Sequence, residues 1–245
     1  MIDWPYPRWV AHRGAGKLAP ENTLAAFELG ACHGYRMFEC DVKLSADDVL
    51  FLLHDATLER TTNGHGEARA QSWQALSKLD AGGWHSAGFT GQRLVSFEVI
   101  AHYCLDKGYF LNIEIKPTPG LEAVTGTALA NAAALLWQDA AVPPLLSSFQ
   151  VASLQAAKSA QPQLPRALLL DKLTPDWLAT ALELECVAVV CKYTLWDEET
   201  VAQAQGAGLR ALSYTVNEES AVQRLTALGT DGIITDRVDL FNPDC

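Results

Sequence analysis

This 245-residue chain has no stretch that approaches the roughly 20 consecutive apolar residues that a bilayer-spanning helix needs. Its N-terminus, Met1-Ile2-Asp3-Trp4-Pro5, also lacks the basic start and the apolar core of a secretory signal. We therefore expect a cytoplasmic protein that makes no stable association with a membrane.

Positive charge is scarce. The chain has 18 Lys and Arg against 29 Asp and Glu, which gives a net charge of −11, and no basic run offsets it. Such a chain repels nucleic-acid backbones, so we expect no nucleic-acid partner. Because the same field does not attract anionic substrates, an anion site in this protein needs local positive charge from a metal ion or from Arg and Lys.

Paired cysteines are absent as well. No Cys-x-x-Cys motif occurs among the six cysteines, which are Cys32, Cys40, Cys104, Cys186, Cys191 and Cys245. This spacing predicts free thiols in a reducing compartment rather than a disulfide framework or a thiolate metal site.

Eight short apolar runs alternate with helical patterns along the chain. The runs are Trp9–Ala11, Met37–Val42, Tyr109–Ile115, Leu145–Ser148, Ala167–Leu170, Val187–Val190, Ala211–Tyr214 and Gly232–Thr235. The helical patterns include Asn22–His33, Leu121–Trp137, Val151–Ala160, Pro175–Leu184, Glu198–Ala207 and Glu218–Leu228. Near-continuous apolar strands are typical of a parallel sheet that is buried on both faces.

The alternation of strands and helices predicts an α/β protein with right-handed crossovers. Eight units in a chain close to the ~250 residues of a typical (β/α)₈ barrel favour a TIM barrel, formed as a single domain over residues 1–245. An open, doubly wound sheet is the rival arrangement.

One segment breaks this rhythm. A strand-like run at Val49–Leu53 is followed by a polar, Gly-rich stretch that is too long for an ordinary loop between a strand and a helix. We predict an insertion at about residues 56–98, between strand 2 and strand 3 of the barrel. Long loops in compact domains are usually functional, so we place it on the catalytic side.

Acidic side chains lie at the C-terminal ends of the second and third core strands. Because side chains alternate across a strand, Glu39 and Asp41 share one face and Cys40 lies on the other. Glu114 and Lys116 share a face in the same way. The C-terminal ends of barrel strands carry the active site, so we expect the three carboxylates to converge there.

Three carboxylates in one pocket repel one another unless a cation neutralises them. Oxygen ligands of this kind suit Mg²⁺ or Ca²⁺. A Glu-x-Asp pair alone fits a salt-bridged or solvent-exposed strand end equally well. The second pair, Glu-x-Lys, is what favours a metal site.

Two histidines lie at strand ends, each next to a charged residue that could take part in binding or catalysis. His12-Arg13-Gly14 follows strand 1, where Arg can hold two phosphate oxygens and Gly permits close approach of a ligand. Asn22 then is a candidate N-cap for the first helix. His54-Asp55 ends the extra strand. Two imidazoles with pKa values near 6.5 suit a general acid and a general base at neutral pH.

Taken in order, these motifs resemble the glycerophosphodiester phosphodiesterase family, and in particular its compact bacterial cytosolic members. The motifs that carry the resemblance are His12-Arg13-Gly14, Pro20-Glu21-Asn22-Thr23, Glu39-x-Asp41-Val42, His54-Asp55, Thr61-Thr62-Asn63-Gly64, Glu114-x-Lys116, Tyr214-Thr215-Val216-Asn217 and Asp231-Gly232-Ile233-Ile234-Thr235-Asp236. The resemblance covers nearly the whole chain.

The resemblance implies a TIM barrel that hydrolyses a small-molecule phosphodiester, such as glycerophosphocholine, to glycerol 3-phosphate and an alcohol. It implies a divalent cation, Mg²⁺ or Ca²⁺. Carried over by matching motif, the metal ligands are Glu39, Asp41 and Glu114, the acid–base pair is His12 and His54, and the phosphate is held by Arg13 and Lys116. Members of the family often have Trp where Tyr214 stands, so we expect Tyr214 to contact substrate and to make the alcohol side of the pocket more polar.

Three other functions fit parts of the pattern. A Schiff-base aldolase would use Lys116 or Lys192 but leaves the acidic cluster and both histidines without a role. A related phosphodiesterase acting on lysophospholipids would share the chemistry. A metabolite-binding barrel would not require a paired acid and base. The sequence alone leaves open which histidine is the acid, whether water or the neighbouring glycerol hydroxyl is the nucleophile, and the oligomeric state.

Overall fold

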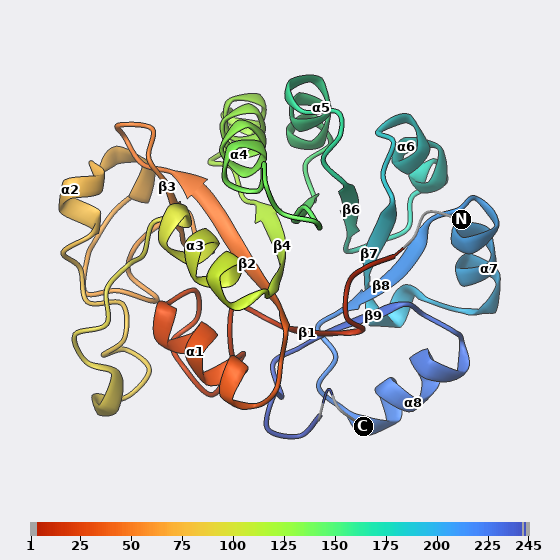
Figure 1. The fold of residues 1–245 in the computed structure, drawn as a ribbon, viewed down its shortest axis with the longest axis horizontal. Helices are drawn as coiled ribbons and strands as arrows, with labels where there is room; N and C mark the ends of the chain where they lie inside the picture. The colour runs from red at the N-terminus through yellow and green to blue at the C-terminus, as the bar shows by residue number, and fades with distance from the viewer. Residues whose placement is uncertain (1–3, 242, 244–245) are drawn as a thin grey trace.

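The computed structural model describes residues 4–241 and 243, and its central feature is a ring of parallel strands (Figure 1). The ring is formed by β1 (Trp9–Ala11), β2 (Met37–Leu44), β4 (Phe110–Ile115), β5 (Leu145–Ser148), β6 (Arg166–Leu170), β7 (Ala188–Lys192), β8 (Arg210–Tyr214) and β9 (Gly232–Thr235). β1 pairs with β9 on one side and with β2 on the other, which closes the ring. The predicted (β/α)₈ barrel is therefore confirmed, and the open sheet is excluded.

Helices surround the ring on its outer side (Figure 1). They are α1 (Leu24–Cys32), α3 (Phe97–Lys107), α4 (Glu122–Leu136), α5 (Val151–Ala160), α6 (Trp177–Glu183), α7 (Glu198–Gly206) and α8 (Glu219–Ala227). The short helix α2 (Trp73–Leu76) lies apart from them, in the segment that follows β3. The sequence analysis did not identify α3, because its first turn coincides with the end of the predicted insertion. Its buried positions, Phe97, Ile100, Ala101 and Cys104, nevertheless follow helical spacing.

Two apolar layers hold the barrel together. One fills its interior and contains Val10, Met37, Leu145, Ala167, Leu169, Ala188, Val190, Leu212 and Ile234. The other lies between the strands and the helices and includes Phe38, Cys40 and Val42 from β2. Strand alternation in β2 therefore sends Phe38, Cys40 and Val42 outward and leaves Glu39 and Asp41 on the inner face.

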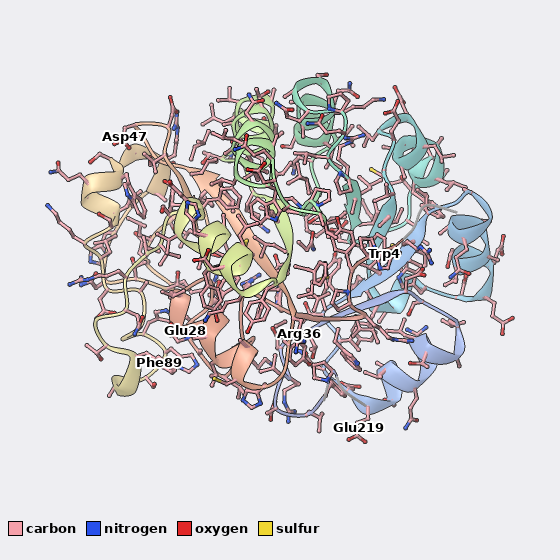
Figure 2. All side chains as sticks on the ribbon, viewed as in Figure 1. Trp4, Glu28, Arg36, Asp47, Phe89 and Glu219 are labelled. Carbon is pink, nitrogen blue, oxygen red and sulfur yellow. The ribbon has the colours of Figure 1, made fainter. Side chains whose placement is uncertain are left out.

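The predicted insertion lies at one edge of the barrel, beyond β2. β3 (Leu50–Leu52) pairs antiparallel with the end of β2, and the segment that follows extends away from the ring in the orange to yellow part of Figure 1. A small buried cluster of its own, including Phe51, Leu58 and Leu76, packs this segment. Phe89, labelled in Figure 2, lies on its outlying loop.

The described part of the chain contains five of the six cysteines. The five cysteines within it are free, as predicted, while Cys245 lies outside the described residues. Among these residues, no helix has the length and apolar character required to cross a membrane.

Candidate active site

A cavity of about 150 Å³ opens at the C-terminal ends of the barrel strands. Its wall contains seven of the eight residues singled out from the sequence, namely His12, Arg13, Glu39, His54, Glu114, Lys116 and Tyr214. The eighth, Asp41, is fully buried directly behind the wall. The structure therefore brings all eight residues together in one place.

The three acidic residues form a tight cluster. One ligand oxygen from each of Glu39, Asp41 and Glu114 lies within 4.8 Å of the other two. Asp41 and Glu114 are direct neighbours in the parallel pairing of β2 with β4. β2 runs on to Leu44, so Glu39 and Asp41 lie within a strand that is longer than predicted, at the level where its neighbours in the ring end.

The surroundings shift the pKa values of these carboxyl groups in different directions. Burial, together with the negative charge of Asp41, raises the pKa of Glu39 to about 8 and that of Glu114 to about 7. Burial acts on Asp41 too, but the nearby cations Arg13 and Lys116 outweigh it and lower its pKa. In the protein alone, the cluster therefore retains protons at neutral pH, mostly on Glu39 and in part on Glu114.

The donor set of this cluster fits a divalent cation. It offers three carboxylates, which are the oxygen ligands that Mg²⁺ and Ca²⁺ prefer. Oδ1 of Asp41 is completely buried, has no hydrogen-bond partner in the described part of the chain, and lies 3.6 Å from Nζ of Lys116. A cation between the three residues would add a direct ligand bond to this buried oxygen.

Arg13 contacts the cluster from a backbone conformation that few residues other than glycine adopt. Its φ is +51°, in the left-handed region. This conformation directs its backbone N–H to Oε2 of Glu39 at 3.0 Å. Its guanidinium lies with Nε 3.2 Å from Oδ2 of Asp41 and with Nη1 2.8 Å from Oε1 of Glu21. Backbone strain of this kind concentrates at functional sites, where the surrounding structure enforces it.

Asn22 does not cap the first helix, contrary to the sequence interpretation. Thr23 is the N-cap of α1, and its side chain accepts a hydrogen bond from the N–H of Ala26. Asn22 instead has a φ of +59° and turns back toward β2. Its Nδ2 donates to Oδ2 of Asp41 at 2.9 Å, and its Oδ1 accepts from the backbone N–H of Asp41 at 3.1 Å. It therefore fixes the orientation of the Asp41 carboxylate.

His12 is held by a carboxylate from the opposite end of the chain. Nδ1 of His12 lies 2.6 Å from Oδ1 of Asp236, directly after β9, and Asn217 donates to the other oxygen of Asp236 at 2.9 Å. Nε2 of His12 lies 3.7 Å from Oε2 of Glu39. Burial works to lower the pKa of His12, but the bond to Asp236 and the charge of Glu39 outweigh it and raise the pKa.

His54 is also held by a carboxylate, in the same way as His12. Its Nδ1 lies 2.7 Å from Oδ1 of Asp55, and its Nε2 lies 3.0 Å from Nζ of Lys116. Burial lowers the pKa of His54, and the positive charges of Arg13 and Lys116 act in the same direction. Each imidazole thus uses Nδ1 for a carboxylate, which leaves Nε2 directed at the charged groups of the cavity.

Two further cations hold the segment that carries His54. Arg60 donates to both Asp55 and Glu21, and the four bonds are 2.7 to 2.9 Å long. Lys43, which is 2% exposed, extends from β2 and donates to the backbone carbonyls of His54 and Asp55. Burial lowers the pKa of Lys43 to about 8. These contacts connect the insertion to the barrel at the level of the acidic cluster.

Two aromatic side chains form part of the cavity wall. Tyr214 and Phe149 meet edge to face with ring centroids 5.7 Å apart, and Nζ of Lys116 lies 5.7 Å from the centroid of Phe149. The hydroxyl of Tyr214 donates to the carbonyl of Leu170 at 3.1 Å. Tyr214 therefore lines the cavity with its hydroxyl engaged by the protein, and its contact with substrate stays a prediction.

The geometry also bears on the aldolase alternative. A Schiff-base lysine needs a lowered pKa so that its amine is neutral. Burial does work to lower the pKa of Lys116, but the charges of Asp41 and Glu114 outweigh it and raise the pKa. Lys192 is exposed and is not among the residues that line the cavity. Lys116 therefore lacks the environment of a neutral catalytic amine, and Lys192 lies outside the cavity.

Comparison with known proteins agrees with this site. The sequence model described as the glycerophosphoryl diester phosphodiesterase family matches residues 12–240. The chain belongs to this family. The match extends from His12 to the segment after β9, so it includes every residue named above.

Relatives within the glycerophosphoryl diester phosphodiesterase family span almost the same length. A glycerophosphodiester phosphodiesterase from Caldanaerobacter subterraneus subsp. tengcongensis is 33% identical over 93% of each chain. One from Bacillus subtilis is 29% identical over 95% of this chain and 84% of its own. The solved structure of an Oleispira antarctica phosphodiesterase, in complex with the product sn-glycerol-3-phosphate, is 30% identical, has a TM-score of 0.88, and is matched over 94% of this chain and 93% of its own.

Several site residues of this family member were not given roles by the sequence analysis. Asp236 and Asn217 lie in motifs that carry the family resemblance, but nothing in their spacing places them beside His12. The predicted closure of the barrel could have indicated this contact. It makes β1 and β9 neighbours, so the residues that directly follow these two strands lie close together. Asn112 and Ser147 also line the cavity. Each is a single polar residue within an apolar run, and nothing in the sequence around them indicates a role in the site.

Proposed function

We propose that this chain hydrolyses glycerophosphodiesters, such as glycerophosphocholine or glycerophosphoethanolamine, to glycerol 3-phosphate and an alcohol, and that it requires Mg²⁺ or Ca²⁺. The observation that carries the proposal is a single cavity in which three carboxylate oxygens within 4.8 Å of one another stand beside two imidazoles, each bonded to its own carboxylate. The product bound to the Oleispira antarctica relative supports the same substrate class.

In this proposal Glu39, Asp41 and Glu114 hold the cation. When bound, the cation withdraws negative charge from the phosphate oxygens and stabilises the charge that develops in the transition state. Arg13 and Lys116 add fixed positive charge beside it and bind the phosphate. A protein with a net charge of −11 needs such local cations to bind an anion.

His12 and His54 act as the proton-transfer pair. Asp236 and Asp55 hold the Nδ1 atoms, so each imidazole presents Nε2 to the substrate. One Nε2 accepts the proton of the nucleophile, and the other donates a proton to the departing alkoxide. A positioned acid or base of this kind contributes about 10²–10⁴-fold to the rate. Tyr214 packs against the alcohol side of the substrate.

The experiment that tests the proposal is a coupled assay for glycerol 3-phosphate with glycerophosphocholine and glycerophosphoethanolamine as substrates. We expect activity in the presence of Mg²⁺ or Ca²⁺, loss of activity with EDTA, and recovery when the ion is returned in excess. A lysophospholipid substrate serves as the comparison. Turnover of the lysophospholipid alone, or full activity in a verified metal-free preparation, would contradict the proposal.

A further inference from the structure

Two polar side chains deep in the barrel have no hydrogen-bond partner among the residues that the structure describes. Asn112 on β4 is 1% exposed, and both its amide nitrogen and its amide oxygen are unpaired there; Ser147 on β5 is fully buried, and its hydroxyl is unpaired in the same way. Buried polar groups are nearly always hydrogen-bonded, because an unpaired one is costly to fold. We call Asn112 and Ser147 the polar floor.

The polar floor belongs to the cavity and lies against the acidic cluster. Both residues line the cavity, together with the apolar side chains of Leu169 and Ile234. In the barrel register, Asn112 is the direct neighbour of Glu39, and Ser147 is the direct neighbour of Glu114. A ligand group that contacts the floor is therefore adjacent to the metal-binding carboxylates.

The charge and the hydrogen-bonding capacity of this region define what it can bind. Arg13 and Lys116 are the side chains proposed to bind the phosphate. Asn112 and Ser147 carry no charge, so an uncharged polar group suits the floor. An amide needs both a donor and an acceptor, and a hydroxyl supplies both. A trimethylammonium group or an acyl chain supplies neither. Leu169 and Ile234 offer contact surface to carbon atoms between hydroxyls.

We propose that the polar floor binds the glycerol hydroxyls of the substrate and thereby sets the preference for a polyol on one side of the phosphodiester. This inference rests on the proposed function, because it assumes that the phosphate lies at Arg13 and Lys116. It assigns the deep part of the cavity to glycerol and the part near Tyr214 to the variable alcohol.

The test compares two substrates in the presence of Mg²⁺ or Ca²⁺. Glycerophosphoethanolamine carries the glycerol hydroxyls, and bis(4-nitrophenyl) phosphate is a diester without them. The variants are Asn112→Leu, which replaces the amide with an apolar group of similar size, and Ser147→Ala. Ser213→Ala is the matched control, because Ser213 is a fully buried serine whose hydroxyl also lacks a partner but which does not line the cavity.

We expect Asn112→Leu to lower kcat/KM for glycerophosphoethanolamine by about 10-fold or more, and Ser147→Ala by about threefold or more, because each leaves a substrate hydroxyl unpaired. Activity on bis(4-nitrophenyl) phosphate falls by a smaller factor, because that substrate has no hydroxyl to lose, so the preference for glycerophosphoethanolamine decreases in both floor variants. Ser213→Ala leaves both activities unchanged. The melting temperature of Asn112→Leu is not lowered, since no hydrogen bond within the protein is lost.

Parallel losses on both substrates would overturn the inference, as would unchanged activity on glycerophosphoethanolamine in both floor variants. If Asn112→Leu fails to fold, Ser147→Ala decides the matter, because it removes a single unbonded atom. A wild-type enzyme that cleaves bis(4-nitrophenyl) phosphate but no glycerophosphodiester would overturn the proposed function itself. Wild-type activity on both substrates, with unaltered selectivity in the variants, would overturn only the role of the floor.

Discussion

Binding of a divalent cation at pH 7 should release about one proton from this protein. Two carboxyl groups that ordinarily have pKa values near 4.3 are raised here, Glu39 to about 8 and Glu114 to about 7. At pH 7 the first is mostly protonated and the second about half protonated. A cation requires all of its carboxylate ligands in the charged form, so binding displaces these protons.

The size of the effect follows from the geometry of the cluster. Charges within 4.8 Å of each other repel by at least about 3.5 kcal/mol at an effective dielectric constant of about 20. That energy alone raises a carboxyl pKa from about 4 to about 7, and burial adds to it. Because raised carboxyl pKa values mean bound protons, the affinity for the cation should increase as the pH rises through 7 to 8.

The assay is isothermal titration calorimetry of the metal-free protein with Mg²⁺ or Ca²⁺, in two buffers of different ionisation enthalpy. We expect about one proton released at pH 7 and close to none at pH 9. Glu39→Gln should bind more weakly and release fewer protons, whereas Glu98→Gln, which alters an exposed glutamate on α3, should match the wild type. Tight binding with no proton release at pH 7 would refute the electrostatic reasoning.

Three further predictions concern the groups around the cluster. His12→Ala and His54→Ala should each lower kcat by at least about 10²-fold with an unchanged circular dichroism spectrum, and near-normal turnover would remove that residue from catalysis. Lys43→Met should lower kcat by about 10-fold, because the backbone at His54 and Asp55 loses its donor, at a cost of about 1–3 kcal/mol for the unpaired carbonyls; unchanged kinetics would contradict this. Arg60 lowers the pKa of Asp55, so its contribution to the unfolding free energy is present above the ordinary carboxyl pKa and lost below it. Denaturant unfolding should show Arg60→Met less stable by about 1 kcal/mol at pH 7, with the difference shrinking below about pH 4; a difference independent of pH would argue against the ion pairs.

The parts of the site that lie on strands were predictable from the sequence. Strand alternation placed Glu39 and Asp41 on one face, and the barrel topology placed them beside Glu114. Both inferences require only the periodicity of a strand and the rule that barrel active sites lie at the C-terminal ends. For the same reason the sequence runs identified the eight barrel strands to within one or two residues at their ends.

The contacts made by loops were not predictable in the same way. His12 and Asp236 are separated by 224 positions, and Arg60 and Glu21 by 39. No periodicity relates residues so far apart, and only the closed ring and the folded insertion bring them together. Asn22 was interpreted as a helix cap because Asn is common there, but its left-handed backbone conformation directs it to Asp41 instead.

The most direct test of the account is a diffraction experiment on crystals of this protein soaked in Mn²⁺, a divalent ion whose anomalous signal identifies its position. We predict an anomalous peak about 2.0–2.6 Å from one oxygen each of Glu39, Asp41 and Glu114. A peak elsewhere, or crystals that bind Mn²⁺ without contact to these three carboxylates, would contradict the claim that they form the metal site.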